Sequence, residues 1–213
     1  MIRIVMADDH AIVREGLKRI VASEPDFQVV GEAGDGHEVM RLAREADFDL
    51  LVLDLSMPGR SGMELIRAVK AEKPRVRILV LSMHQESQYA VRAIKSGASG
   101  YLTKDSAPAE LAQALRKIAA GGAYVSAEVA QQLALGAMPG AEAAAPHEAL
   151  SSREFEVFQL LAAGVSVTDI AGRLSLSVKT VSTHKANLMH KLGVQNASEL
   201  VRYAIRHGVG EGL

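Results

Sequence analysis

One short strand pattern that ends in a carboxylate constrains the fold of this chain more than any other feature. Residues 50–53 are all apolar, and Asp54 follows them directly. An uninterrupted apolar run of this length, bounded by a loop, is typical of a strand buried on both faces of a parallel sheet. Such sheets bind ligands beyond the carboxyl ends of their strands. We therefore expect Asp54 to project from a rigid strand into a binding crevice.

Three further apolar runs, at 2–7, 78–81 and 100–103, also end in polar side chains. In chain order, the polar residues that follow these runs are Asp8 with Asp9, then Ser82, then Lys104. If the strands are parallel neighbours, all these groups share one site with Asp54, because the carboxyl ends of the strands lie at one edge of the sheet.

Carboxylates crowded at one edge repel one another, so each becomes easier to protonate. A hard divalent cation such as Mg²⁺ relieves this repulsion, because it takes oxygen ligands and keeps several waters. A carboxylate beside a cation and an ammonium also suits a transferring phosphoryl group, and aspartate can itself be the nucleophile. Two simpler roles stay open at this point, since Asp9 could cap a helix and Ser82 could be an ordinary loop hydroxyl.

The strand-like runs begin at intervals of about 25 residues, which is the length of one strand-plus-helix unit. Helical patterns fill the intervals, at 11–23, 36–46, 61–73, 87–96 and 108–120. Alternation of this kind predicts an α/β fold with helices on both faces of a parallel sheet. We expect five strands in a flavodoxin-like order.

With this ordered set of residues, positions 1–120 resemble a response-regulator receiver domain. The resemblance implies that Asp54 accepts phosphate from a sensor histidine kinase. It also implies that Mg²⁺ binds at Asp9, Asp54 and the backbone carbonyl of Ser56, with Asp8 assisting through water. Ser82 would follow the phosphoryl group, and Tyr101 would change rotamer with it.

One departure from the family pattern concerns the residue after Lys104. Many receivers have a proline there, preceded by a cis peptide bond, whereas this chain has Asp105. A cis bond before a residue other than proline costs about 2.5–4 kcal/mol, so the resemblance does not determine the isomer here.

Other classes of protein fit the residues less well. An aspartyl-phosphate phosphatase of the haloacid-dehalogenase type needs a second aspartate two residues after the nucleophile, where this chain has Ser56. A flavodoxin-like electron carrier would have its flavin phosphate repelled by Asp8 and Asp9. A regulator that works without phosphorylation is the remaining alternative, and the intact acidic set argues against it. We therefore expect that the protein is not an enzyme.

Composition limits the location and partners. The 213 residues carry a formal net charge of −1, so any nucleic-acid surface must be local. They include no cysteine, which excludes disulfide bonds and is compatible with a reducing cytosol. No apolar run is long enough to cross a membrane and no signal peptide is evident, which predicts a cytoplasmic protein without a membrane partner. Residues 121–146 are rich in Ala, Gly and Pro and read as a linker, with one short helix at 126–135.

From 147 to 213 the pattern is wholly helical. Four helices are expected: one from Ser151 or Ser152 to Gly164, then 167–174, 178–192 and 197–207. The second and third are joined by a short turn, which is typical of a helix-turn-helix. Four apolar residues of the third helix recur at helical spacing and are expected to face the core: Val178, Val181, Leu188 and Leu192.

Most other positions of this third helix are basic or small and polar, and the segment has no acidic residue. Lysines suit DNA phosphates, while hydroxyls and amides suit base edges in the major groove. A solvated basic face on an ordinary bundle is the alternative, and His184 could equally be a packing residue. The expected DNA contacts are Lys179, Thr180, Ser182, Thr183, Lys185, Asn187 and Lys191.

Residues 150–193 resemble a LuxR-type helix-turn-helix, through Leu150 to Glu154, Asp169-Ile170-Ala171, 178–181 and 191–194. Receiver and helix-turn-helix together resemble the NarL/FixJ family of bacterial response regulators. That resemblance implies a phosphorylation-controlled transcription regulator that binds promoter DNA as a homodimer, with RNA polymerase as a further partner it allows. The last helix would supply the dimer contact, for which Val201, Ala204 and Ile205 are candidates unless they belong to the core.

Overall fold

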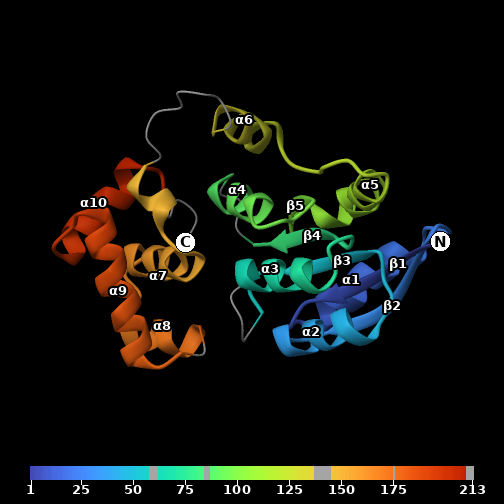
Figure 1. Ribbon diagram of the computed structural model, residues 1–213, viewed down its shortest axis with the longest axis horizontal. Helices are drawn as coiled ribbons and strands as arrows, with labels where there is room; N and C mark the ends of the chain where they lie inside the picture. The colour runs from blue at the N-terminus through green and yellow to red at the C-terminus, as the bar shows by residue number, and fades with distance from the viewer. Residues whose placement is uncertain (58–61, 84–86, 137–144, 175, 210–213) are drawn as a thin grey trace. The chain divides into compact units, whose positions relative to one another are not determined.

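In the computed structural model (Figure 1), residues 1–57, 62–83, 87–136, 145–174 and 176–209 are described. They divide into two compact units, Met1–Ala134 and Leu135–Leu213. The exact domain boundaries expected from the sequence, 1–120, 121–146 and 147–213, remain predictions. Part of the expected linker lies outside the described residues.

A sheet of five parallel strands forms the centre of the first unit, in the order β2-β1-β3-β4-β5. The strands are β1 (Ile2–Ala7), β2 (Phe27–Ala33), β3 (Leu50–Asp54), β4 (Arg77–Ser82) and β5 (Gly100–Thr103). All five residues of β3 are buried, as expected for the central strand of a sheet covered on both faces. The flavodoxin-like order predicted from the sequence is confirmed.

Helices cover both faces of this sheet (Figure 1). The helix α1 (Ala11–Ala22) packs against α5 (Ala107–Ala119), while α2 (Gly36–Glu45), α3 (Gly62–Glu72) and α4 (Ser87–Lys95) form the other layer. A single apolar cluster joins α1 and α5 to the sheet, with Leu111, Leu115 and Ile118 of α5 fully buried. The two layers hold the strands rigidly, and this fixes where their carboxyl ends deliver side chains.

The segment after α5 does not leave the domain as a free linker. Tyr124 adds to the edge of β5, because its carbonyl accepts from Tyr101 N at 2.8 Å and its N–H donates to the Ser99 carbonyl at 3.1 Å. Gly100 permits this approach, since a Cβ there would lie 2.9 Å from the Tyr124 carbonyl oxygen. The expected short helix then follows as α6 (Ala127–Gly136).

The second unit contains the four helices expected from the sequence, preceded by a short 3₁₀ turn, η1 (Pro146–Ala149). These helices are α7 (Ser152–Ala162), α8 (Val167–Arg173), α9 (Val178–Leu192) and α10 (Ala197–Arg206). Both α9 and α10 pack on α7, and α8 packs on α9. Ser177 caps α9 and Asn196 caps α10, because each side chain accepts a backbone N–H from the first turn of its helix.

Candidate functional site

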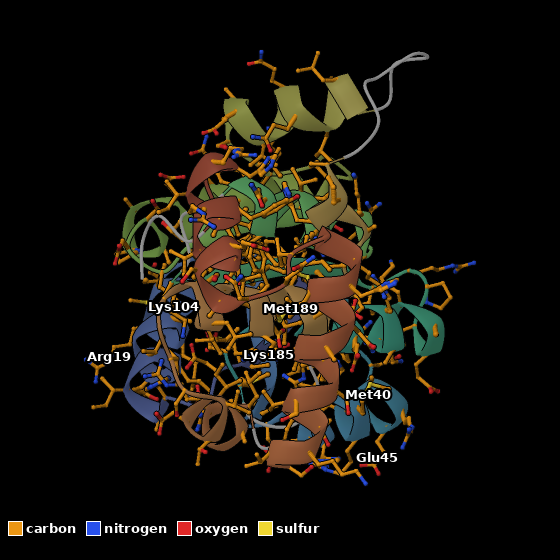
Figure 2. The ribbon with its side chains drawn as sticks, turned by 90° about the vertical axis from the view of Figure 1, so that its left-hand side faces the viewer. Arg19, Met40, Glu45, Lys104, Lys185 and Met189 are labelled. Atoms are coloured by element: carbon orange, nitrogen blue, oxygen red, sulfur yellow. The ribbon has the colours of Figure 1, made fainter. Side chains whose placement is uncertain are left out.

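The parallel strands bring the predicted polar residues together at one edge. Asp54 is the last residue of β3 and Ser82 the last of β4, while Asp8 and Lys104 directly follow β1 and β5. The Lys104 side chain (labelled in Figure 2) places Nζ 2.7 Å from Asp54 Oδ2 and 2.7 Å from Asp8 Oδ2. The side chains of Asp8 and Asp54 are only 2% and 0% exposed, so this is a buried ionic cluster.

Burial decides the protonation chemistry of this cluster. Burial raises the pKa of the Asp54 carboxyl, and the Lys104 ammonium and the Ser56 N–H oppose that rise without cancelling it. Burial by itself lowers the pKa of Lys104, but its contacts with Asp54 and Asp8 outweigh burial, so the pKa is raised. Lys104 therefore remains a cation beside a carboxylate that is harder to ionise than an ordinary aspartate.

Asp9 lies at the open side of the cluster, with its side chain 32% exposed. Asp9 does not cap the following helix, because the cap position of α1 is His10 and that residue makes no side-chain cap bond. Asp8, Asp9, His10 and Asp54 each offer a ligand atom, and these atoms lie within 4.8 Å of one another. Three carboxylates that converge in this way fit a hard divalent cation, because such a cation takes oxygen ligands.

The other predicted residues of the receiver lie around this cluster. The backbone N–H of Ser56 donates to Asp54 Oδ1 at 2.9 Å, which places Ser56 beside the carboxylate. Ser82 is fully buried, and its carbonyl accepts from Lys104 N at 2.8 Å. All peptide bonds of the described chain are trans, including the bond between Lys104 and Asp105.

Tyr101 lies farther back on β5, in the wall of a cavity of about 340 Å³. Residues from the segment after α5 line the same cavity, among them Tyr124 and Val129. Tyr124 Oη donates to Glu110 Oε2 at 2.6 Å. This hydrogen bond, with a contribution from burial, raises the pKa of Tyr124 to about 12. The sequence analysis missed Tyr124, although it is the one aromatic residue in the predicted linker.

The helix α9 presents most of its predicted DNA contacts to solvent. Lys179, Ser182, Thr183 and Asn187 are exposed, and Thr180 and Lys185 are half-buried. Within the described parts of the chain, Lys179 and Lys185 form no ion pair with an acidic side chain. Figure 2 shows Lys185 and Met189, which lie one turn apart on this helix. These two lysines are available to a polyanion.

The hydroxyl side chains of α9 turn back toward their own helix. Ser182 Oγ donates to the Val178 carbonyl at 2.9 Å, and Thr183 Oγ1 donates to the Lys179 carbonyl at 3.0 Å. The Thr180 hydroxyl instead lies 2.8 Å from Oγ of the cap residue Ser177. Thr180 therefore also helps to define where the helix begins.

Lys191 has a partner that the sequence analysis did not foresee. Its Nζ lies 2.7 Å from Oε2 of Glu154 on α7, and that same oxygen accepts the Ser151 N–H at 2.8 Å. Burial by itself raises the pKa of Glu154, but Lys191 and the two bonds with Ser151 outweigh burial and lower it. This arrangement couples the last turn of α9 to the capping box of α7.

In the second unit, the predicted core position of Val178 is wrong, and the predicted dimer contacts of α10 differ in exposure. Val178 was expected in the core but is 48% exposed, because it begins α9 and the first turn extends past the packed part of the helix. Of the dimer candidates on α10, Ala204 is buried in the core, whereas Ile205 is 70% exposed. Among the described residues of that helix, Ile205 is the only large apolar residue that is strongly exposed.

Comparison with known proteins agrees with this geometry. Residues 4–116 match the response regulator receiver domain, and residues 148–204 match the luxR family of bacterial regulatory proteins. The response regulator GacA of Pseudomonas aeruginosa is 36% identical over 209 residues, which cover 98% of each chain. The response regulator UvrY of Escherichia coli K12 is 34% identical and covers 98% of this chain and 96% of its own.

Solved structures give the same result. RcsB of Salmonella enterica serovar Typhimurium, bound to promoter P1flhDC with the phosphomimetic BeF₃⁻, has a TM-score of 0.67 at 31% identity over 95% of this chain and 97% of its own. A LuxR-family response regulator from Aurantimonas sp. SI85-9A1 is 46% identical, with a TM-score of 0.59, over 63% of this chain and 96% of its own.

The chain therefore belongs to the two-component response regulators that combine a receiver domain with a luxR-type DNA-binding domain. Because the family consists of transcription regulators, the phosphatase and electron-carrier interpretations are set aside. In the described residues, every helix is too short or too polar to cross a membrane. The predicted cytoplasmic location and the contact with RNA polymerase remain predictions.

Proposed function

We propose that Asp54 is the phosphoacceptor of this response regulator and that its phosphorylation controls binding of α9 to promoter DNA. The observation that carries the proposal is the position of Lys104 Nζ, 2.7 Å from carboxylate oxygens of both Asp54 and Asp8. A fixed cation beside a buried carboxylate is the arrangement that stabilises charge developing on a transferring phosphoryl group. Family membership supplies the donor class, a sensor histidine kinase.

In the proposed reaction one oxygen of the ionised Asp54 carboxylate attacks phosphorus, and the bond from phosphorus to the donor histidine nitrogen breaks. The product is an aspartyl-phosphate, and the histidine leaves with its electron pair. Asp8, Asp9, Asp54 and the Ser56 carbonyl would hold Mg²⁺, which when bound neutralises charge on the phosphoryl oxygens. Lys104 then contacts the new phosphoryl group, and its release from Asp54 is part of the switch.

Three neighbouring residues support a route for the signal out of the site. Ser82 is linked to Lys104 through its carbonyl, and in the proposed switch its hydroxyl moves to bond a phosphoryl oxygen. Tyr101 faces a cavity of about 340 Å³ into which a new rotamer can move. Tyr101 is also bonded through its backbone to Tyr124, in the segment that leads to α6. A shift of β5 therefore reaches the linker directly.

The basic face of α9 supports the DNA-binding half of the proposal. In this proposal Lys179 and Lys185 contact phosphates, and the exposed Ser182, Thr183 and Asn187 read base edges. Structures of the relative RcsB bound to promoter DNA, and of RcsB dimers bound to DNA, support a promoter target and a homodimer for this chain. In that dimer the exposed Ile205 of α10 is our candidate contact, and Ala204 is not.

The test uses acetyl phosphate and Mg²⁺ with the full chain. We expect phosphate incorporation, and tighter or altered promoter binding, in the native chain and in Asp105→Ala, which removes an exposed carboxylate next to Lys104. Asp54→Ala should incorporate no phosphate and give a DNA mobility shift that acetyl phosphate does not change. Incorporation that survives in Asp54→Ala would refute the site assignment. A native chain that is phosphorylated without any change in DNA binding would favour the phosphorylation-independent alternative.

A further inference from the structure

The residue after the acidic pair, His10, is turned toward the carboxylates. Its Nδ1 lies 2.8 Å from Asp9 Oδ1 and 3.3 Å from Asp8 Oδ1. Its side chain is 64% exposed, so one edge of the imidazole faces the acidic cluster while much of the ring meets water. Sequence reasoning stopped at the two aspartates and gave this histidine no role.

The His10 imidazole does not hold the start of α1. His10 occupies the cap position of α1 with extended backbone, yet its side chain makes no cap hydrogen bond. Instead its backbone N–H donates to Asp8 Oδ1 at 2.8 Å. That bond fixes the orientation of the residue, and its side chain points toward Asp8 and Asp9.

The spacing of these atoms matches one coordination shell. Adjacent ligands of an octahedral cation with bonds of about 2.1 Å are about 3 Å apart, and opposite ligands are about 4.2 Å apart. The contacts of His10 Nδ1 with Asp9 and Asp8 bracket the first of these separations. The ligand atoms of the complete set of Asp8, Asp9, His10 and Asp54 lie within 4.8 Å of one another, somewhat wider than the second separation, so the side chains would close slightly around an ion.

We propose that His10 is an additional metal ligand, which gives this site a preference for nitrogen-binding divalent metals over Mg²⁺. The inference rests on the proposed Mg²⁺ site at Asp8, Asp9 and Asp54. Imidazole suits Ni²⁺, Zn²⁺ and Fe²⁺, whereas Mg²⁺ prefers oxygen and readily keeps water in place of a nitrogen ligand. Such metals would compete with Mg²⁺ for the phosphoacceptor site of this chain.

The test measures metal binding directly, by calorimetry on the tag-free full chain with Ni²⁺ and, separately, with Mg²⁺. Only Ni²⁺ that Mg²⁺ displaces is counted, because the chain has seven histidines. In His10→Ala we expect the affinity of that site for Ni²⁺ to fall about tenfold or more, as for loss of a metal-orienting group, with little change for Mg²⁺. The matched control is His37→Ala, which removes an exposed histidine of the same unit and should change neither affinity.

The outcomes separate this inference from the proposed function. If Mg²⁺ fails to bind the native chain, or binds Asp9→Asn equally well, the proposed Mg²⁺ site itself is wrong. If Mg²⁺ binds as proposed but His10→Ala changes Ni²⁺ and Mg²⁺ affinity by the same factor, the role of His10 is refuted. If Mg²⁺ displaces none of the bound Ni²⁺, the role of His10 is refuted as well, because the imidazole then only donates a hydrogen bond to Asp9.

Discussion

The strand-end cluster and the surface of α9 both use lysines, but in opposite surroundings. The side chain of Lys104 is 11% exposed and touches two buried carboxylates, whereas Lys179 is exposed and has no acidic partner among the described residues. Charges in a dry site interact strongly, and charges in water are screened by solvent and salt. The first arrangement can therefore set protonation and reactivity, while the second can bind a polyanion reversibly.

The two regions also differ in how their side chains are held. Asp54 and Ser82 end adjacent strands of one sheet, so the strand register fixes their separation. The α9 side chains depend on where one helix begins and how it packs on α7. Loss of a group in the first region should disturb both stability and chemistry. Loss of an exposed group in the second should change binding alone.

The largest effect should follow from Lys104→Met. Without the ammonium, Asp8 and Asp54 stay buried beside each other with no cation, and breaking a buried pair in this way costs about 3–5 kcal/mol. The pKa of Asp54 should rise further, because Lys104 now holds it down against burial. Urea unfolding without divalent metal measures the first effect, and the pH dependence of phosphorylation by acetyl phosphate measures the second. An Asp54 that ionised only at higher pH would need a higher pH to react.

The comparison fails if Lys104→Met unfolds at the same urea concentration as the native chain. Lys18→Met is the matched control, because Lys18 pairs with Glu15 and Glu32 at the surface of the same unit. We expect its loss to matter much less, since exposed pairs are screened.

An intermediate effect is expected from Lys179→Ala and Lys185→Ala. Each should weaken DNA binding, and each should reduce the slope of log affinity against log salt by about 0.9 if it neutralises one phosphate. Thermal unfolding should stay unchanged, since neither lysine has an ion-pair partner in the described chain. Fluorescence anisotropy with promoter DNA at several salt concentrations gives the slope. An unaltered slope in both variants would remove this face as the phosphate-binding surface.

The smallest effect should come from Lys191→Met, and it sharpens the comparison within α9 itself. Lys191 is half exposed and pairs with buried Glu154, so we expect a loss of about 1 kcal/mol of stability with the salt slope unchanged. Combining Lys191→Met with Glu154→Gln tests the pair, because the double variant should lose less than the sum of the single losses. A slope reduced as in Lys179→Ala would instead make Lys191 a phosphate contact, as the sequence pattern alone suggested.

The sequence by itself determined the sheet order, the helices and the meeting of Asp8, Asp54, Ser82 and Lys104. These features follow from local periodicity and from the rule that parallel strands share one carboxyl edge. It also determined most helix ends, because a cap such as Ser177 acts within its own first turn.

Only the tertiary structure decided which groups from separate elements touch. The bond of Lys191 to Glu154 crosses 37 residues, and the addition of Tyr124 to β5 depends on the edge strand being open at Gly100. Val178 has the right spacing for the core, but how far the packed surface reaches along α9 placed it in solvent. The direction of His10 toward Asp8 and Asp9 likewise depends on the geometry of one loop. Periodicity assigns residues to faces, whereas the packing of one element on another selects their partners.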